Sequence, residues 1–172
     1  MSEPTLHINL TSLQKNLNYI QTLSSPTVET AAVVKANAYG LGVDPLAVCL
    51  FNKGVNTFFV STASEAVELR LLLQKKPTIY YLNGYSVTDY NAVNDYDIIP
   101  VLNSLAQIEN FKQKLHNKPA AMQLDVGMKR LGINSYEILK AKELCRSINL
   151  KLILGHLSSA DDRSDPANIR QL

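Results

Sequence analysis

The chain has 172 residues, of which 46% are hydrophobic and 19% are charged, and its formal net charge is +2. A chain of this length can bury one substantial core, and the composition is that of an ordinary soluble globular domain. Because its lysines and arginines form no cluster and its aromatic residues are not interleaved with positive charge, the sequence excludes a typical nucleic-acid-binding surface.

The N-terminal stretch "MSEPTLHINL" has no basic flank and no long apolar segment. It predicts neither a signal peptide nor a membrane span. Cys49 and Cys145 both fall on apolar faces of predicted helices, which favours free thiols in a reducing compartment. These features predict a cytoplasmic protein. No metal site is expected.

Short, nearly continuous apolar runs alternate with amphipathic stretches along the whole chain. Such runs are typical of parallel strands that are covered on both faces. In chain order the predicted strands are 30–35, 57–61, 78–83, 97–103, 120–126 and 150–157. No Gly/Ser linker or charge block divides them, so one domain is expected.

Helix-start signals lie before and between these strands. In chain order the predicted starts are Thr11, Asp44 followed by Pro45, Thr62 in a capping box with Glu65, Asn103, Asn134 with Glu137, and Asp165 followed by Pro166. Gly54 is the expected stop of the second helix. The alternation predicts βαβ units and an α/β fold, either an open doubly wound sheet or most of an eight-stranded barrel. The dinucleotide fingerprint G-x-G-x-x-G is absent, since only "GLG" follows the first strand.

Polar residues stand at the carboxyl ends of the predicted strands, where both architectures place their chemistry. They are Lys35, Asn83, Asp125, His156 and, in the loop after the fifth strand, Arg130. Four of them also have a structural interpretation: Lys35 as a solvated lysine, Asp125 as a loop cap, His156 as a core histidine and Arg130 as a surface arginine. A lysine at the apolar end of a strand is desolvated, which favours the neutral amine that imine formation requires. The turn after it offers backbone donors and the Tyr39 hydroxyl to a phosphate.

Three stretches together resemble a known family. "AVVKANAYGLG" resembles the pyridoxal-phosphate attachment motif of alanine racemases, "LDVGMKRLGI" the arginine loop of that family, and "GHLSSADD" its histidine segment. The opening "LHINLTSLQKNL" is similar to the family's first strand and helix. The motifs occur in the family's order and spacing, over essentially the whole chain.

This resemblance implies a (β/α)8 TIM barrel that holds pyridoxal 5'-phosphate in its mouth. Lys35 matches the lysine that forms the internal aldimine and then moves one proton at the substrate Cα. Tyr39 matches the residue that holds the cofactor phosphate, and His156 matches the histidine beside the cofactor ring. Arg130 matches the arginine near the cofactor's phenolic oxygen and the substrate carboxylate.

The chain departs from the family pattern in two respects. Gln123 stands where the family often has a lysine, sometimes carrying a carbamate, seven residues before the arginine. An amide can hydrogen-bond Arg130 but cannot supply an anion. If an anion is required there, something else, such as a bound chloride, must provide it. In addition, about six of the eight strands are present, so residues 1–172 are expected to be a partial barrel domain. The second base, the group opposite the pyridine nitrogen and the C-terminal β domain are then expected beyond Leu172.

The resemblance implies a racemase that supplies D-alanine for peptidoglycan and forms a homodimer. Two alternatives stay open, namely a racemase of serine or of broad specificity, and a single-domain pyridoxal-phosphate carrier of the same barrel type. Such carriers share the lysine but lack the "KANAYGLG" continuation, which favours the racemase.

Overall fold

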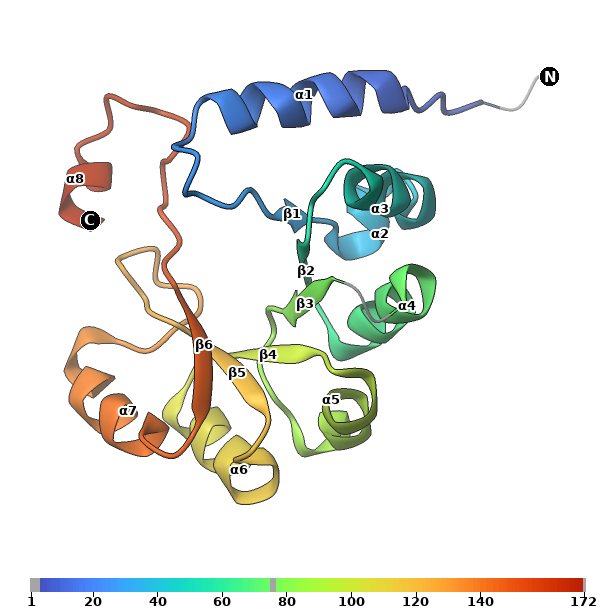
Figure 1. Cartoon of the computed structure of the whole chain (residues 1–172). Coiled ribbons are helices and arrows are strands. Elements are labelled where there is room, and N and C mark those ends of the chain that lie inside the picture. The colour runs from blue at the N-terminus through green and yellow to red at the C-terminus, as the bar shows by residue number, and fades with distance from the viewer. Residues whose placement is uncertain (1–3, 75–76, 172) are drawn as a thin grey trace.

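The computed structural model describes residues 4–74 and 77–171, along which strands and helices alternate (Figure 1). The strands are β1 (Ala32–Val33), β2 (Thr57–Val60), β3 (Thr78–Tyr81), β4 (Ile99–Leu102), β5 (Pro119–Gln123) and β6 (Asn149–Leu154). The helices are α1 (Leu10–Thr22), α2 (Lys35–Tyr39), α3 (Val43–Asn52), α4 (Ala63–Leu73), α5 (Tyr90–Tyr96), α6 (Leu105–Leu115), α7 (Ile138–Cys145) and α8 (Ala167–Gln171). Two 3-10 turns, η1 (Val87–Asp89) and η2 (Ser135–Glu137), precede α5 and α7.

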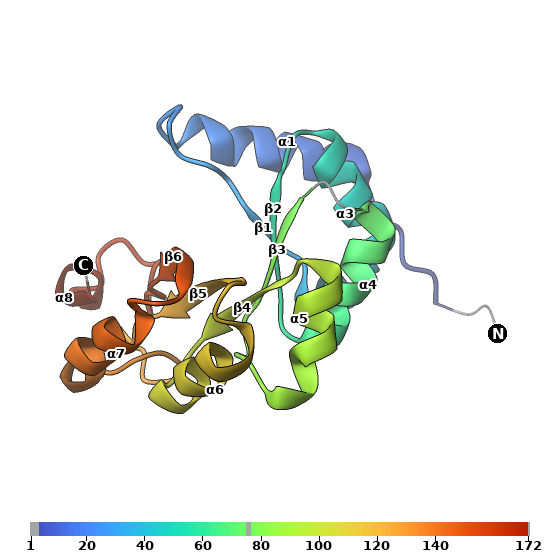
Figure 2. The same ribbon diagram turned by 60° about the horizontal axis from the view of Figure 1, so that its bottom comes forward.

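The strands form one parallel sheet in chain order, β1-β2-β3-β4-β5-β6. A doubly wound sheet reverses its strand order at a switch point, whereas a barrel adds each strand beside the last. The order therefore excludes the doubly wound alternative and confirms an α/β fold of the barrel type. Helices α3 to α7 lie on the convex side of the strand arc (Figures 1 and 2).

The two faces of the sheet carry separate apolar clusters, because successive side chains of a strand point to opposite faces. Phe58 and Tyr81 belong to the larger cluster, between the sheet and the helices. Tyr80 belongs to a smaller cluster on the concave face, where its ring stacks on Phe59 at a centroid distance of 5.0 Å. Burial of a side chain such as Phe58 contributes about 1.5–3 kcal/mol, so most of the stabilisation lies beneath the helices.

The two predicted capping boxes are confirmed. The Thr62 hydroxyl accepts the N–H of Glu65 at 3.3 Å, and the Glu65 carboxylate accepts the N–H of Thr62 at 3.1 Å. Asn134 and Glu137 form the second box, which opens η2 and leads into α7. Each box satisfies two of the N–H groups that a helix start leaves without partners.

Three other predicted helix starts are displaced. The N-cap of α1 is Asn9 and not Thr11, because the Asn9 side chain accepts an N–H from the first turn. Helix α3 begins at Val43, since Gly42 turns the chain at φ 92°, and Asp44 therefore lies in the first turn and is not its cap.

Helix α6 is capped by Ser104, whose hydroxyl accepts an N–H of the first turn. The predicted cap, Asn103, is used differently. Its buried side-chain amide donates to the carbonyls of Leu82 at 2.8 Å and of Val101 at 3.0 Å, which ties the ends of β3 and β4 together.

Both cysteines are free thiols, as predicted, with Cys49 buried and Cys145 half-buried. Burial raises the pKa of the Cys145 thiol. Among residues 4–74 and 77–171, no helix combines the length and apolar character that a membrane crossing requires. Nor does this part of the chain bring together three or more His, Cys, Asp or Glu side chains that could hold a metal ion.

The sheet has two free edges in the described part of the chain, at β1 and at β6. Strand β6 alternates between exposed and half-buried residues, and Ile153 on it is 55% exposed. At the other edge, Val33 of β1 is 45% exposed. The arc is therefore open between its first and last strands (Figure 1).

Candidate functional site

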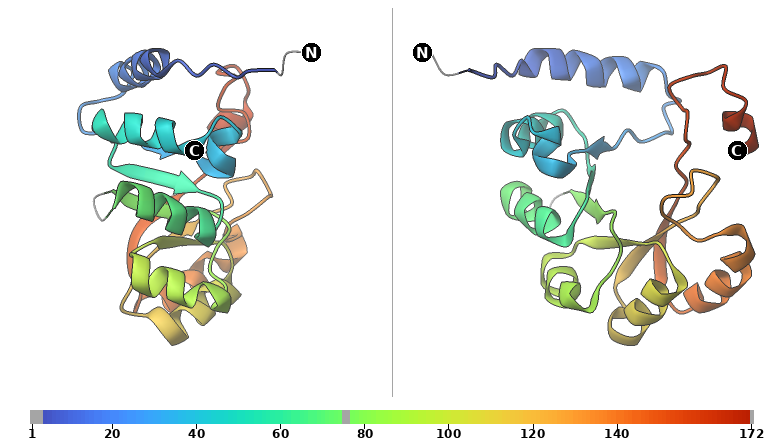
Figure 3. Two further views of the ribbon diagram at one scale, coloured as in Figure 1. Left: turned by 90° about the vertical axis from the view of Figure 1, so that its right-hand side faces the viewer. Right: turned by 180° about the vertical axis from the view of Figure 1, so that it is seen from behind.

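The segments that follow β1, β5 and β6 lie at the end of the sheet that the carboxyl termini of its strands form, which is called the site edge below. Because all the strands are parallel, their carboxyl ends meet there. In the side view of Figure 3 (left), α2, the loop after β5 and the segment after β6 project from the same side of the strands. These segments carry the predicted site residues Lys35, Tyr39, Arg130 and His156. The structure thus gathers at one edge residues that lie up to 121 positions apart in the numbering of the chain.

Lys35 directly precedes a left-handed turn. The predicted strand 30–35 is wrong at its carboxyl end, because β1 covers only Ala32–Val33 and α2 begins at Lys35. The four residues from Ala36 to Tyr39 have φ values of 51°, 53°, 54° and 56°. A residue such as alanine or tyrosine in this conformation costs roughly 1–2 kcal/mol, so Ala36, Ala38 and Tyr39 together store roughly 3–6 kcal/mol. Strain of this kind persists only where the surrounding structure holds it, and it concentrates at functional sites.

The hydrogen bonds of Asn37 hold the second half of this turn. Its backbone carbonyl accepts the N–H of Gly42 at 3.0 Å, and its side-chain Oδ1 accepts the N–H of Val43 at 2.8 Å. The second bond caps α3 from outside that helix, which is why Asp44 is not needed as a cap.

Glu65 of α4 holds the first half of the turn. Its Oε1 accepts the N–H of Ala36 at 2.7 Å, while its Oε2 accepts the N–H of Ser61 at 2.7 Å and of Thr62 at 3.1 Å. One carboxylate therefore joins the turn after β1 to the end of β2. The sequence pattern predicts only the capping box for Glu65, because a bond across 29 residues leaves no local pattern.

The Lys35 side chain is half-buried, so the full desolvation expected at a strand end is not observed. Its Nζ lies 5.9 Å from the centroid of the Tyr39 ring, within the range of a cation–π contact. Tyr39 is 62% exposed. The amine and the phenol thus stand together at the edge and are open to a ligand.

The loop after β5 is ordered by Asp125. Its Oδ1 accepts the N–H of Lys129 at 2.9 Å and of Gly127 at 3.0 Å, and these bonds hold the pKa of the Asp125 carboxyl below its usual value. Gly132 closes the loop at φ 115°, where a Cβ would lie only 2.6 Å from the Asp125 nitrogen. Two roles were expected for Asp125, a functional one at a strand end and capping of the loop. The structure shows the loop cap.

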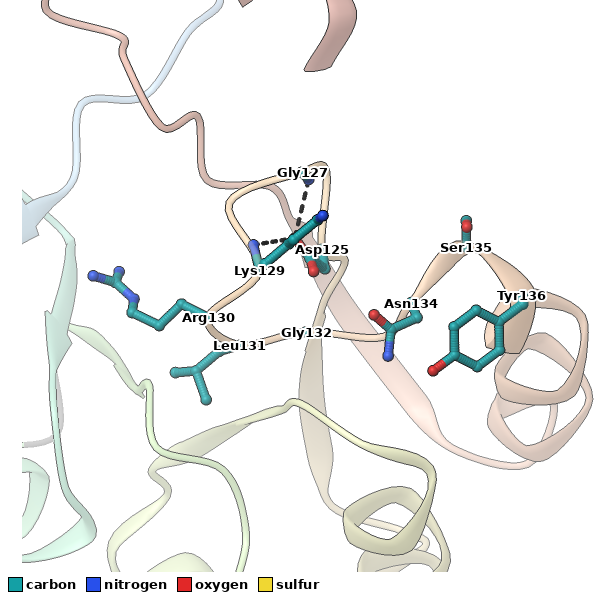
Figure 4. A pocket seen from close by; sticks show the side chains of 9 residues that line it. All are labelled: Asp125, Gly127, Lys129, Arg130, Leu131, Gly132, Asn134, Ser135 and Tyr136. Carbon is teal, nitrogen blue, oxygen red and sulfur yellow. Dashed lines mark hydrogen bonds between the residues drawn. The ribbon is translucent and has the colours of Figure 1, made fainter. Parts of the chain in front are cut away.

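Arg130 stands on this loop as an exposed side chain. The loop and η2 line an open pocket of about 520 Å³ (Figure 4). In that view the Arg130 guanidinium extends away from β5 and β6. A guanidinium held on an ordered loop presents a planar fork of donors to carboxylate or phosphate oxygens.

Gln123 supports the loop backbone. Its buried side-chain amide donates from Nε2 to the carbonyl of Leu131 at 3.3 Å, next to Arg130 in the chain. On the neighbouring strand end, the buried Oδ1 of Asn103 has no hydrogen-bond partner among the described residues. The ends of β4 and β5 thus carry two buried side-chain amides, those of Asn103 and Gln123, and the Asn103 Oδ1 is an acceptor that no described residue uses.

His156 and Asn83, the remaining predicted residues, are both exposed. His156 follows β6 by two residues and stands at the same edge as Lys35. Asn83 takes part through its backbone, since its N–H donates to the carbonyl of Ser61 at 3.0 Å. Asn83 therefore has a structural role, in which its backbone joins the end of β3 to the end of β2.

Comparison with known proteins gives a consistent result. Residues 8–172 match the family described as alanine racemase, N-terminal domain. The alanine racemase of Brucella suis is 41% identical over 97% of this chain and 44% of its own length. That of Rickettsia prowazekii is 36% identical over the whole chain and 44% of its own length. The chain thus spans less than half the length of these curated relatives.

A solved structure has the same fold. The alanine racemase of Bartonella henselae with covalently bound pyridoxal phosphate has a TM-score of 0.87 and 36% sequence identity to this chain. The match covers 95% of this chain and 47% of that one. The similarity therefore includes the backbone arrangement as well as the sequence.

Proposed function

Because the chain belongs to the alanine racemase family through its N-terminal domain, we propose that it is part of an enzyme that interconverts L- and D-alanine with pyridoxal 5'-phosphate. One observation carries this proposal. Lys35 directly precedes a strained turn at the carboxyl edge of a barrel-type sheet, in a chain that matches the family over residues 8–172.

The activity proposed belongs to a longer protein, since the chain covers 44% of the relatives' length. Residues 1–172 are proposed to be a partial barrel domain. The rest of the barrel, a C-terminal β domain, a second base and the group opposite the pyridine nitrogen lie outside these residues in this proposal. The complete protein is proposed to be a cytoplasmic homodimer that supplies D-alanine for peptidoglycan. We propose alanine and not serine as the substrate, because these relatives are named alanine racemases.

The residues present fit this cofactor chemically. Pyridoxal phosphate has an aldehyde, a phosphate dianion, a phenolic oxygen and an aromatic ring. The site edge provides a primary amine on Lys35, a phenol on Tyr39, a guanidinium on Arg130 and an imidazole on His156, all at least partly exposed. The amine can condense with an aldehyde, and the phenol and guanidinium can donate to anionic oxygens. Every functional group of the cofactor except the ring nitrogen therefore has a partner among these side chains.

Each residue then has a defined task. When bound, pyridoxal phosphate supplies an electron sink that makes the substrate Cα–H acidic. Lys35 holds the cofactor through Nζ and moves the Cα proton on one face, and Arg130 binds the substrate carboxylate through its fork of donors. Tyr39 donates to the phosphate, and His156 orients the ring. Gln123 keeps the Arg130 loop in place through Leu131.

Borohydride reduction of the full-length protein, followed by peptide mapping, tests this proposal. The pyridoxyl adduct is expected on Lys35, and Lys35→Ala is expected to abolish both the visible imine absorbance and racemisation. Lys53→Ala is the matched control, because Lys53 ends α3 away from the site. An adduct on Lys53 or Lys129 instead would overturn the assignment.

A further inference from the structure

The carboxylate of Glu65 lies where three backbone N–H groups from two strand ends converge. It accepts from Ala36 through Oε1 and from Ser61 and Thr62 through Oε2, at distances of 2.7, 2.7 and 3.1 Å. Bonds to an ionised acceptor are roughly twice as strong as neutral ones. A helix cap alone requires only the bonds within the box, so the bond to Ala36 calls for a separate explanation.

Ala36 is the residue that follows Lys35 and the first of the left-handed run. Later N–H groups of the turn bond within the turn or to Val34, for example Gly40 to Ala36 and Ala38 to Val34. The Ala36 N–H is instead held by another element, α4. The entry into the strained turn, and with it the backbone of Lys35, is thus fixed from outside.

We infer that Glu65 is a positioning residue for Lys35, which holds the left-handed turn at its first residue so that the lysine amine has a fixed direction toward the cofactor. This inference rests on the proposed function, because it assigns Lys35 as the cofactor lysine. Glu65 does not touch the reacting atoms in this role. It acts through the Ala36 N–H.

Three variants of the full-length protein separate positioning from helix capping. Glu65→Gln replaces one acceptor oxygen with an NH2 donor, which cannot accept from the N–H groups that converge there. Thr62→Ala removes the hydroxyl that caps α4 but leaves the carboxylate bond to Ala36. Glu68→Gln makes the same charge change on an exposed residue of the same helix.

The first measurement is the rate at which added pyridoxal phosphate forms the visible imine with the apoprotein. Loss of a charge-assisted hydrogen bond at the turn is expected to slow this rate about ten-fold in Glu65→Gln, and Thr62→Ala and Glu68→Gln are expected to stay within about two-fold of the parent. An equal effect of Thr62→Ala, or no effect of Glu65→Gln, would overturn the inference. If Glu65→Gln does not fold, Glu65→Asp replaces it. Its carboxylate is one methylene too short to span both strand ends, and the same slowing is expected.

The second measurement is amide hydrogen exchange at Ala36 in the apoprotein, which needs no cofactor. Exchange is expected to be about ten-fold faster in Glu65→Gln than in Thr62→Ala or Glu68→Gln. A protein that never forms an imine would contradict the proposed function, and the exchange data would still test the contact to Ala36. Unchanged exchange at Ala36 would overturn the inference even if the racemase assignment holds.

Discussion

At the scale of single residues, the side chains that hold the loop after β5 in place differ from the side chain that is available to a ligand. Asp125 orders the loop backbone and Gln123 anchors it through Leu131. Neither side chain has a hydrogen bond to Arg130 among the described contacts. The arginine's donors therefore stay available to a ligand while its backbone is fixed.

Arg130→Lys in the full-length enzyme tests that availability. Lysine keeps the positive charge but loses the planar fork that serves two oxygens, so kcat/KM for alanine is expected to fall about 10- to 100-fold. Arg163→Lys, an exposed arginine in the segment after β6, is the matched control and is expected to change little. Unchanged kinetics in Arg130→Lys would mean that this arginine serves only the loop.

The depressed pKa of Asp125 predicts a pH dependence of stability. Because the folded-state pKa lies below the ordinary value, the carboxylate contributes stability above about pH 4, and this contribution is lost as the pH falls through the folded-state value. Asparagine cannot titrate. The difference in unfolding free energy between the parent and Asp125→Asn is therefore expected to be constant near neutrality and to shrink in acid. Denaturant unfolding at several pH values measures it, and a difference that grows in acid would contradict the prediction.

At the scale of elements, short sequence motifs predicted the features that hydrogen bonds between near neighbours form, such as helix caps and helix stops. The capping boxes at Thr62 and Asn134 are confirmed, and the stop at Gly54 coincides with a positive φ of 91° just after α3. All six strands overlap their predicted ranges, although β1 is much shorter than predicted. Helix α5 was not predicted, because its only buried residue is Val93 and its sequence lacks a continuous apolar face.

The roles of Lys35, Tyr39, Arg130 and His156 stay predictions from the motifs, and the structure places the four residues at one edge. The local geometry of this edge was not predicted. The left-handed run was not predicted, since alanine and tyrosine rarely adopt positive φ and Asn37 is the one residue of the four whose type favours it. The bond from Ala36 to Glu65 joins positions 29 apart, so only the folded sheet brings the two residues together.

Arg70 joins three elements on the helical side of the sheet. Its buried guanidinium on α4 donates to the carbonyls of Gln74, Pro77, Tyr96 and Asp97 at 2.8–3.0 Å. One side chain thus satisfies the backbone at the end of α4, before β3 and after α5.

Arg70→Met removes these donors and leaves carbonyls without partners, so the free energy of unfolding is expected to fall by about 3 kcal/mol. Urea unfolding measures the change. Arg163→Met, on an exposed residue, is the control and should stay close to the parent. A small effect of Arg70→Met would mean that water replaces the guanidinium at these carbonyls.

At the scale of the whole molecule, the open arc decides solution behaviour. Among the residues that the structure describes, the outer sides of β1 and β6 pair with no other strand, and Val33 and Ile153 expose apolar surface there. Free edges and exposed apolar area both promote association with other chains.

Residues 1–172 produced alone are therefore expected to self-associate or aggregate, to bind pyridoxal phosphate weakly and to show no racemisation. Light scattering measures the mass in solution, and a D-alanine assay with added cofactor measures activity. A monomer of 19.1 kDa that racemises alanine would contradict both the edge argument and the proposed place of the second base.

The turn after Lys35 also has a consequence for chirality. A backbone with φ near +50° is strained for an L-residue but relaxed for its mirror image, because inversion at Cα removes the contact between Cβ and the following carbonyl oxygen. Ala36 is exposed. A chain assembled by chemical ligation with D-alanine at position 36 is expected to unfold at a higher temperature than the all-L chain. In a protein proposed to produce D-alanine, this is a position where that enantiomer fits the backbone better than the one the ribosome supplies.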